Sequence, residues 1–387
     1  MADQTSMRVM QICTNFLPGG IQRHVLDLTQ DLRGRGHKIV LAGDQGDWSA
    51  DGADPDFVPV ALNNVAGVGG SLYRRVSALP ACALTVRKAI RAHGIELIHA
   101  HETAPAIVAR LATTGMDIPI AMTFHGAAPA REAGVARTAR LCAELTISPS
   151  RTALDALIAH GLPRAKARTI GLGIHPLPDV PEAEAQALRK RIMGGKEGVL
   201  ILSLSRLQPQ KGIDVMIEVA RRVVARRPDV VFAIAGKGPL AEAAAGWARD
   251  AGVADNVKFL GAISTVPQHL KASDIFLLTS RWENLPISIV EAFRAGLPVV
   301  ATDCGGVKEL VDGEVGALLA VEDARAIAAA VLELVENPGL RRARGAAALA
   351  RSLEHRFRPA TVHDEFERTY EQLIGPKSLR KPAKLLE

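Results

Sequence analysis

Two carboxylates eight residues apart, Glu283 and Glu291, are suited to hold a molecule that carries neighbouring hydroxyl groups. They follow the apolar run Asp274–Thr279, which is typical of a buried strand. Pro286 suits the first turn of a helix, so Glu283 is expected in a loop and Glu291 on the helix that follows. Carboxylate oxygens accept hydrogen bonds from vicinal hydroxyls. The pattern therefore predicts a site for a sugar or a ribose, and two unrelated glutamates are the alternative.

A pair of cations occupies the loop after an earlier strand. Arg206 and Lys211 follow the run Val199–Ser205 and precede a helix that is expected to start near Ile213. The arginine offers a fork of hydrogen-bond donors, and the lysine offers a mobile point charge. Together they can neutralise a diphosphate without a metal. The loop is interpreted as a diphosphate site, and solvated surface charge is the alternative.

Adjacent glycines follow two further apolar runs. Gly19–Gly20 open the helix Ile21–Arg33, and Gly305–Gly306 follow a strand near the end of the sequence. Glycines let a backbone approach a ligand closely, and a helix start offers N–H groups to an anion. A merely tight strand-to-helix turn is the alternative. Neither pair, nor Gly236–Lys237–Gly238, forms the G-x-G-x-x-G fingerprint of dinucleotide binding, which argues against an NAD-dependent dehydrogenase.

Histidines stand at the ends of two strands. His125 follows the run Ile120–Phe124, so its side chain is expected to project into a ligand site. His99 and His101 alternate on another strand and therefore share one face of it. A metal site needs at least a third ligand, and none is clearly placed beside them, so no metal and no cofactor are expected. Three further residues are assigned to packing or surface positions, namely His24, His37 and Cys304.

The fold that positions these residues is read from the alternation of short apolar runs with helical patterns. Continuous apolar runs between amphipathic helices are typical of parallel strands buried on both faces. A break at residues 173–198, rich in proline and glycine, separates two such series. The sequence predicts an α/β protein with two doubly wound, Rossmann-like domains facing a central cleft. Ligands of such sheets bind beyond the carboxyl ends of the strands, where the residues above are expected.

Composition sets the broad class of the protein. The chain has 387 residues, 48% hydrophobic and 23% charged, which suits two globular domains. The N-terminus lacks the apolar core of a secretory signal, no run is long enough to span a membrane, and the four cysteines are scattered, so a cytoplasmic protein is expected. The net charge of +6 comes with basic clusters that are expected either to face solvent or to contact an anionic lipid or a phosphorylated acceptor. Basic residues are not interleaved with aromatics, so no nucleic-acid partner is expected.

Taken together, these motifs resemble those of glycosyltransferase family 4, retaining enzymes of the GT-B fold, over nearly the whole chain. The Arg206/Lys211 loop followed by the glutamate pair is the most specific part of the resemblance. Three departures from the family pattern are Gly171–Leu172–Gly173–Ile174 at the hinge, Lys237 in place of an acidic residue, and Pro286 in the donor loop. The matching stretches begin at Pro18, Arg33, Thr123, Arg206, Gly236, Glu283 and Asp303.

The resemblance implies a role for each matching position. Arg206 and Lys211 would hold the diphosphate, Glu283 the sugar hydroxyls and Glu291 the ribose, while His125 would contact the transferred sugar. Residues 1–173 would form the acceptor-side domain and 174–359 the nucleotide-sugar-binding domain, with a last helix at about 360–387 packing back on the first. The catalytic set is His125, Arg206, Lys211 and Glu283, and the donor-binding set adds Gly19, Gly20, Gly236, Asn284, Leu285, Ile287 and Glu291.

The implied reaction moves a hexose-type sugar from a nucleoside diphosphate sugar to a hydroxyl of a glycan or lipid-linked acceptor, in the synthesis of cell-surface polysaccharide or glycolipid. Retention without an enzymatic nucleophile suggests attack by the acceptor hydroxyl on the face that the diphosphate leaves. The variable loops 63–73 and 127–137 are expected to select the acceptor. Two alternatives stay open: a nucleotide-sugar epimerase of the same fold, and a non-catalytic protein that binds nucleotide sugars.

Overall fold

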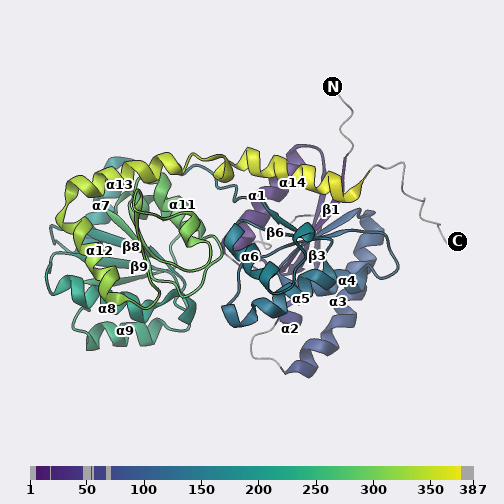
Figure 1. The fold of residues 1–387 in the computed structure, drawn as a ribbon, viewed down its shortest axis with the longest axis horizontal. Coiled ribbons are helices and arrows are strands. Elements are labelled where there is room, and N and C mark those ends of the chain that lie inside the picture. Colours follow the sequence, from purple (N-terminus) through teal and green to yellow (C-terminus); the bar gives the residue numbers. More distant parts are fainter. Residues whose placement is uncertain (1–5, 18, 47–53, 55, 67–70, 376–387) are drawn as a thin grey trace. The chain divides into compact units, whose positions relative to one another are not determined.

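The computed structural model describes residues 6–17, 19–46, 54, 56–66 and 71–375 (Figure 1). The chain divides into two compact units. Unit 1 is formed by Met1–Gly173 together with Pro359–Glu387, and unit 2 by Ile174–Arg358. Among the described residues, no helix is both long and apolar enough to cross a bilayer. The basic segment Lys377–Lys384, and with it the end of the last helix predicted at about 360–387, lies outside the described residues.

Unit 1 is built on a parallel sheet with the strand order β3-β2-β1-β4-β5-β6-β7. Its described strands are β1 Arg8–Asn15, β2 Lys38–Asp44, β3 Phe57–Pro59, β4 Leu97–His101, β5 Ile120–Thr123, β6 Leu145–Ser148 and β7 Ala167–Thr169. Its helices are α1 Gly20–Gly34, α2 Asn63–Ala66, α3 Leu72–His93, α4 Thr103–Ala112, α5 Glu132–Cys142, α6 Arg151–Ala159 and α14 Pro359–Ile374, with short 3₁₀ turns at Pro129–Arg131 and Arg164–Lys166.

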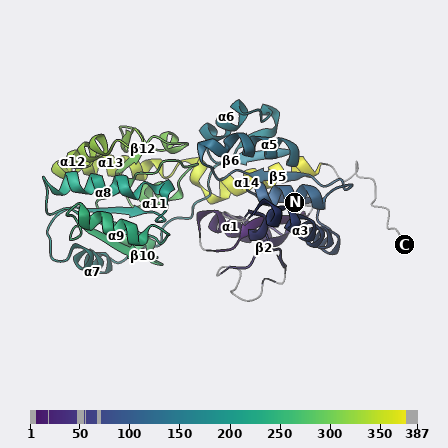
Figure 2. The same cartoon turned by 90° about the horizontal axis from the view of Figure 1, so that it is seen from below.

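Both faces of this sheet are covered, which explains why its strands are apolar without alternation. Helices α3, α4, α5 and α6 pack on one face against side chains such as Met10 and Ile98. In Figure 2, α5 and α6 lie side by side in this layer. Helices α1 and α14 cover the other face, where Leu28 and Phe366 meet Val9. The final helix is thus part of the core of unit 1, although about 300 residues separate it from α1 in the sequence.

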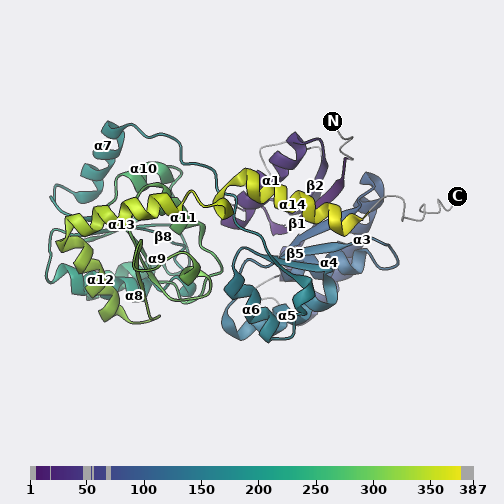
Figure 3. The ribbon, with the colours of Figure 1, turned by 45° about the horizontal axis from the view of Figure 1, so that its top comes forward.

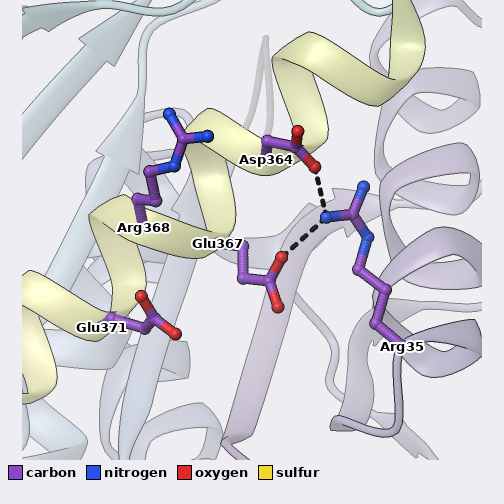
Figure 4. Close-up of a pocket in the computed structure, with 5 residues that line it drawn as sticks. All are labelled: Arg35, Asp364, Glu367, Arg368 and Glu371. Carbon is purple, nitrogen blue, oxygen red and sulfur yellow. Dashed lines mark hydrogen bonds and ion pairs between the residues drawn. The ribbon is translucent and has the colours of Figure 1, made fainter. Parts of the chain in front are cut away.

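Hydrogen-bonded ion pairs connect α14 to the end of α1 (Figure 4). The Arg35 guanidinium donates to Asp364 Oδ1 at 2.5 Å and to Glu367 Oε2 at 2.7 Å. The second oxygen of Glu367 lies 2.7 Å from Nε2 of His37. Burial alone would raise the pKa of Glu367, but the hydrogen bonds from His37 and Arg35 outweigh it and lower that pKa. His37 is therefore a buried partner of α14 and not a surface residue.

Unit 2 repeats the architecture with the strand order β10-β9-β8-β11-β12-β13, again parallel. Its strands are β8 Leu200–Leu204, β9 Val231–Ala235, β10 Val257–Gly261, β11 Ile275–Leu278, β12 Val299–Thr302 and β13 Gly316–Leu319. Its α-helices are α7 Glu182–Met193, α8 Ile213–Val224, α9 Ala241–Asp250, α10 Val266–Lys271, α11 Ile287–Arg294, α12 Ala324–Glu336 and α13 Pro338–Arg351. Short 3₁₀ turns lie at Pro209–Lys211, Val307–Glu309 and His355–Phe357.

Helices again cover both faces of the sheet of unit 2. Helices α8, α9 and α12 share one apolar cluster with β8 and β9, in which Ile217 and Val331 are buried. Helices α11 and α13 pack side by side (Figure 3). Gly345 of α13 lies against the turn that follows α11, where a Cβ atom would lie 2.2 Å from the carbonyl oxygen of Gly296.

Two edge strands differ from what the sequence predicts. The apolar run Phe57–Leu62 predicts one continuous strand, but β3 ends at Pro59, because the chain leaves the edge of the sheet after a residue that has no N–H to donate. The edge strand β13, Gly316–Leu319, was not predicted. It is only four residues long and starts at a glycine, where a Cβ would lie 1.7 Å from the carbonyl oxygen of Val299.

Candidate functional site

The strand order of unit 2 reverses direction between β8 and β11, which are neighbours in the sheet. In doubly wound sheets, ligands bind beyond the carboxyl ends of the strands at such a switch point. The loop after β8 carries Arg206 and Lys211, and the loop after β11 carries Glu283. The structure therefore brings the predicted cations and the first predicted carboxylate to one place in the fold.

Lys211 and Glu283 meet directly across these two loops. The Lys211 ammonium lies 2.5 Å from Oε1 of Glu283, and the Ser280 hydroxyl donates to the same oxygen at 2.7 Å. Both charged side chains are largely buried, with 13% and 9% of their surface exposed. Arg206, by contrast, is exposed on the loop. The site thus offers one paired cation, one accessible cation and a carboxylate whose second oxygen faces no partner among the described hydrogen bonds.

Arg281 fixes the relative position of the two loops. Its guanidinium donates to the carbonyl oxygen of Pro209 at 2.6 Å, to Asp214 at 2.7 Å and to Glu322 at 2.5 Å. Its hydrogen bonds to Asp214 and Glu322 raise the pKa of this guanidinium. Further bonds join Gln210 to the segment 281–282. Arg281 thus links its own segment, which precedes Glu283, to the residues on either side of Lys211.

Glycines allow these loops to lie close together. At Gly305, φ is +55° and a Cβ atom would lie 1.9 Å from the carbonyl oxygen of Glu283. At Gly236, φ is +149° and a Cβ would lie 2.2 Å from the carbonyl oxygen of Ser205. The sequence predicted that Gly305–Gly306 let the backbone approach a ligand, but the structure shows Gly305 against protein backbone. Its role is to bring the loop after β12 against Glu283.

Helix α11 begins directly after the loop of Glu283. Pro286 is its N-cap and Ile287 its first residue, so the proline stands one position earlier than the predicted first turn. Asn284 and Leu285 are buried between Glu283 and the helix, and Gly306 donates its N–H to the carbonyl oxygen of Asn284. Glu291 lies on α11 as predicted. The first N–H groups of α11 lack carbonyl partners within the helix and give this end a positive potential.

In unit 1 the switch point lies between β1 and β4. Gly19 is the N-cap of α1 in an extended conformation, Gly20 is its first residue, and the first turn has no acidic residue. The helix thus starts at the glycine pair, as the sequence predicted, and an anion site at its first N–H groups stays a prediction. Pro18 of the predicted motif lies outside the described residues.

A cluster of imidazoles lies at the same edge of unit 1. His99 and His101 share a face of β4 as predicted, with ring centroids 4.2 Å apart. His125, which follows β5, lies with its ring 5.4 Å from that of His101 and nearly parallel to it. His24 of α1 lies 6.2 Å from His125 and is buried, so it belongs to this cluster rather than to the surface. Its position, four residues after Gly20, is the signal in the sequence that could have identified it.

Burial keeps these imidazoles neutral. It lowers the pKa of His125 to about 3 and that of His24 to about 4, with smaller contributions from neighbouring histidines. The pKa values of His99 and His101 are also well below the usual value, again chiefly through burial. In the described part of the chain, no group of three or more His, Cys, Asp or Glu side chains is arranged to hold a metal ion. With their pKa values lowered in this way, the four rings are neutral near pH 7 and can exchange hydrogen bonds as donors and acceptors.

Glu102, in the loop after β4, has a strained backbone. Glu102, directly after β4, has φ +79° and ψ 179°, a conformation that is nearly restricted to glycine and costs on the order of 1–3 kcal/mol. Sequence reasoning did not identify it, because no motif signals backbone strain.

Cys304 is buried beside the Glu283 loop, and burial raises the pKa of its thiol to about 12, which agrees with the predicted packing role.

Comparison with known proteins shows to which family the chain belongs. Residues 18–176 match Glycosyltransferase Family 4, and residues 186–351 match Glycosyl transferases group 1. The chain is similar to a GDP-mannose-dependent alpha-(1-6)-phosphatidylinositol monomannoside mannosyltransferase of Mycolicibacterium smegmatis, with 31% identity over 69% of this chain and 74% of that one. The chain belongs to glycosyltransferase family 4. This glycosyltransferase is also similar to a phosphatidyl-myo-inositol mannosyltransferase of the same organism, with 28% identity over 95% of both chains.

A solved structure supports the fold of the glycosyltransferase. Anabaena Alr3699/HepE in complex with UDP and glucose matches with a TM-score of 0.80 and 21% identity, over 94% of this chain and 99% of that one. WaaG, a glycosyltransferase involved in lipopolysaccharide biosynthesis, matches with a TM-score of 0.75 and 16% identity, over 95% of this chain and 100% of that one. The two parallel-sheet units are thus the Rossmann-like domains of a GT-B glycosyltransferase.

Proposed function

We propose that this glycosyltransferase moves a hexose from a nucleoside diphosphate sugar to a hydroxyl of a lipid-linked acceptor, with retention at the anomeric carbon and without a metal. The observation that carries the proposal is the pairing of Lys211 with Glu283 at the switch point of unit 2, beside the exposed Arg206. This arrangement supplies positive charge for a diphosphate and a carboxylate for sugar hydroxyls within one set of loops.

In the proposed reaction, the bond between the anomeric carbon and the diphosphate oxygen breaks, and the acceptor oxygen forms the new bond on the same face. The electron pair of the broken bond stays on the leaving diphosphate, which takes the proton of the acceptor hydroxyl. Arg206, Lys211 and the first N–H groups of α11 stabilise the negative charge that develops on the diphosphate. Glu283 orients sugar hydroxyls, and Glu291 is assigned to the ribose by family resemblance.

GDP-mannose is the first donor to test, because the relative with 31% identity is named as dependent on it. Phosphatidylinositol-based lipids are the first acceptors, because the related mannosyltransferases are named for them. The epimerase alternative predicts a new nucleotide sugar from the donor alone, whereas the transferase predicts a new glycolipid only when the acceptor is present. A protein that only binds nucleotide sugars yields neither product.

A cytoplasmic protein that acts at the inner face of the membrane fits such an acceptor, and α3 supports the proposal of membrane contact. Tyr73, Val76 and Leu84 on this helix are 84%, 55% and 54% exposed. Their spacing of three and eleven residues places them on one face, which Lys88 and Arg91 share. Exposed apolar side chains beside basic ones are typical of helices that bind the surface of an anionic bilayer.

A thermal-shift series tests the donor site, with GDP, UDP, ADP, CMP and NAD, each measured with and without EDTA. A nucleotide at a hundred times its dissociation constant stabilises the protein by about 2.7 kcal/mol, which raises Tm by several degrees. The expected result is a shift with one nucleoside diphosphate that EDTA does not abolish. A shift with NAD alone, or with none of the diphosphates, contradicts the proposed donor site. Anomeric configuration of the product, determined by NMR, tests retention.

A further inference from the structure

A continuous line of hydrogen bonds runs from Gln11 of β1 to His125. Oε1 of Gln11 lies 2.8 Å from Nε2 of His101, and Nδ1 of His101 lies 3.1 Å from Nε2 of His125. Gln11 is completely buried and His101 is 1% exposed, whereas His125 is partly exposed. The line therefore starts inside unit 1 and ends at a side chain that a ligand can reach.

The side-chain carbonyl of Gln11 determines which ring nitrogens of His101 and His125 carry a hydrogen. A carbonyl oxygen only accepts, so Nε2 of His101 carries the hydrogen that faces Gln11. A neutral imidazole has one N–H, which leaves Nδ1 of His101 as an acceptor for the N–H of His125 Nε2. His125 then has no hydrogen on Nδ1. Since burial keeps both rings neutral, this arrangement is the one that persists near pH 7.

The other histidines of the cluster do not interrupt this line. His99 is satisfied separately, with the Tyr370 hydroxyl at 2.6 Å from Nδ1 and the Thr123 hydroxyl at 2.6 Å from Nε2. Thr123 ends β5 two residues before His125, so this second set of bonds fixes the backbone that carries His125. Among the bonds of the described residues, Nδ1 of His125 has no protein partner, which leaves it open to a ligand.

We propose that Gln11 is a positioning residue that acts through His101 to hold His125 in one tautomer, with Nδ1 presented as a hydrogen-bond acceptor to a hydroxyl of the sugar. The proposal rests on the proposed function for the identity of the ligand, but the tautomer itself is a property of the free protein. A Gln11 amide in the opposite orientation would donate a hydrogen bond to Nε2 of His101. Donor and acceptor would then be exchanged in the bond between His101 and His125 as well, so that Nδ1 of His125 would carry the hydrogen.

The tautomer is measured directly on the full chain labelled with ¹⁵N-histidine, without nucleotide or sugar, at pH 8.5. Long-range ¹H–¹⁵N correlation spectra distinguish the two neutral tautomers, and the signals of His125 are assigned by their loss in His125→Gln. We expect the hydrogen of His125 on Nε2. A hydrogen on Nδ1 in the unsubstituted protein overturns the proposal.

Two substitutions of similar size separate positioning from packing. Gln11→Glu keeps an acceptor oxygen, and pH 8.5 keeps His101 neutral beside the new carboxylate, so His125 is expected to retain its tautomer. Gln11→Met keeps the bulk but has no acceptor oxygen, so a mixture of tautomers is expected. An unchanged tautomer in Gln11→Met overturns the relay. If Gln11→Met does not fold, as judged by circular dichroism, the unsubstituted protein and Gln11→Glu still decide the polarity.

Kinetics then connect the tautomer to the reaction. With the donor identified by thermal shift, Gln11→Met is expected to lower kcat/KM about tenfold, while Gln11→Glu at pH 8.5 stays within about twofold of the unsubstituted enzyme. Binding of the free nucleoside diphosphate is expected to stay unchanged in both. Unchanged turnover in a Gln11→Met protein with mixed tautomers overturns the positioning role. Failure of the proposed function would give a different result. The tautomer of His125 would still change in Gln11→Met, but the unsubstituted protein would bind no nucleoside diphosphate.

Discussion

Lys211 and Glu283 are 72 residues apart in the sequence, and Nζ of the lysine lies 2.5 Å from Oε1 of the glutamate. Each residue stands on a loop after one of the two strands that flank the switch point of unit 2. A diphosphate that binds here has to share Lys211 with this carboxylate or draw the lysine away from it. The ion pair therefore holds the lysine at the site and orients the carboxylate.

Replacing either member of this pair is expected to lower turnover at least about a hundredfold, as loss of a preorganised electrostatic group does in other enzymes. The measurement is kcat and kcat/KM for Lys211→Ala, Glu283→Ala and the double variant. Because the two residues act as a unit, the double variant should lose less than the sum of the single losses. Lys190→Ala, at an exposed position in the last turn of α7, is the control. Near-normal turnover of a folded single variant would reject that residue's role.

The hydrogen bonds of Arg281 predict an effect on nucleotide binding. Arg281→Ala is expected to weaken nucleotide binding about tenfold, because the segments before Lys211 and Glu283 lose their shared partner. Arg281→Lys should fall between Arg281→Ala and the unsubstituted enzyme, since a lysine cannot form the planar fork. Calorimetric titration with the nucleoside diphosphate measures the effect. The control is Arg221→Ala, whose exposed guanidinium bonds only Glu218 of its own helix within the described part of the chain. Equal affinity in all four proteins would show that Arg281 does not position the loops.

Much of the fold was predictable because parallel sheets leave a simple pattern. Runs such as Ile275–Leu278 are buried on both faces, so they are apolar without alternation, and polar motifs follow them directly. The same rule indicated where Arg206 and Lys211 would lie. Short edge strands escape it: β13 has four residues and begins at a glycine, and β3 stops at Pro59.

The histidine cluster could be predicted only in part. Alternation on β4 put His99 and His101 on one face, and a strand end placed His125. The covering helix α14 comes from the far end of the sequence, so no local pattern shows that Phe366 and Tyr370 bury these rings. Likewise, the role of Gly305 depends on the carbonyl oxygen of Glu283, which only the folded chain brings to it. Contacts between distant segments decide such details.

Helix α3 gives a prediction about membranes. Leu84→Asp is expected to reduce binding to vesicles that contain an anionic phospholipid by about tenfold or more, because it places a charge on the exposed apolar face. Co-sedimentation with anionic and with neutral vesicles measures the effect, and high salt should weaken binding through Lys88 and Arg91. Leu141→Asp, at a leucine that is 59% exposed on α5, is the matched control. A similar loss in both variants, or equal binding to neutral vesicles, would contradict membrane contact through α3.

The buried imidazoles predict that the protein loses stability in mild acid. The pKa of His125 is lowered to about 3 and that of His24 to about 4, and His99 and His101 shift in the same direction. Below pH 6.5 the unfolded chain therefore binds protons that the folded chain excludes, so the free energy of unfolding falls as pH drops from about 6.5 toward 4. At pH 5.5, His24 and His125 are each expected to cost on the order of 1 kcal/mol relative to pH 7.5, and His99 and His101 act in the same direction.

Urea denaturation at pH 7.5 and 5.5 measures this loss, and His24→Phe identifies its source. Phenylalanine fills a similar volume next to Phe366 and takes up no proton, so the variant should lose less stability between the two pH values than the unsubstituted protein. His160→Gln removes a histidine that is exposed at the end of α6 and should leave the difference unchanged. If His24→Phe and the unsubstituted protein lose the same free energy, proton uptake by this cluster on unfolding is not the cause, and carboxylates that pair in the folded state would have to account for the acid sensitivity.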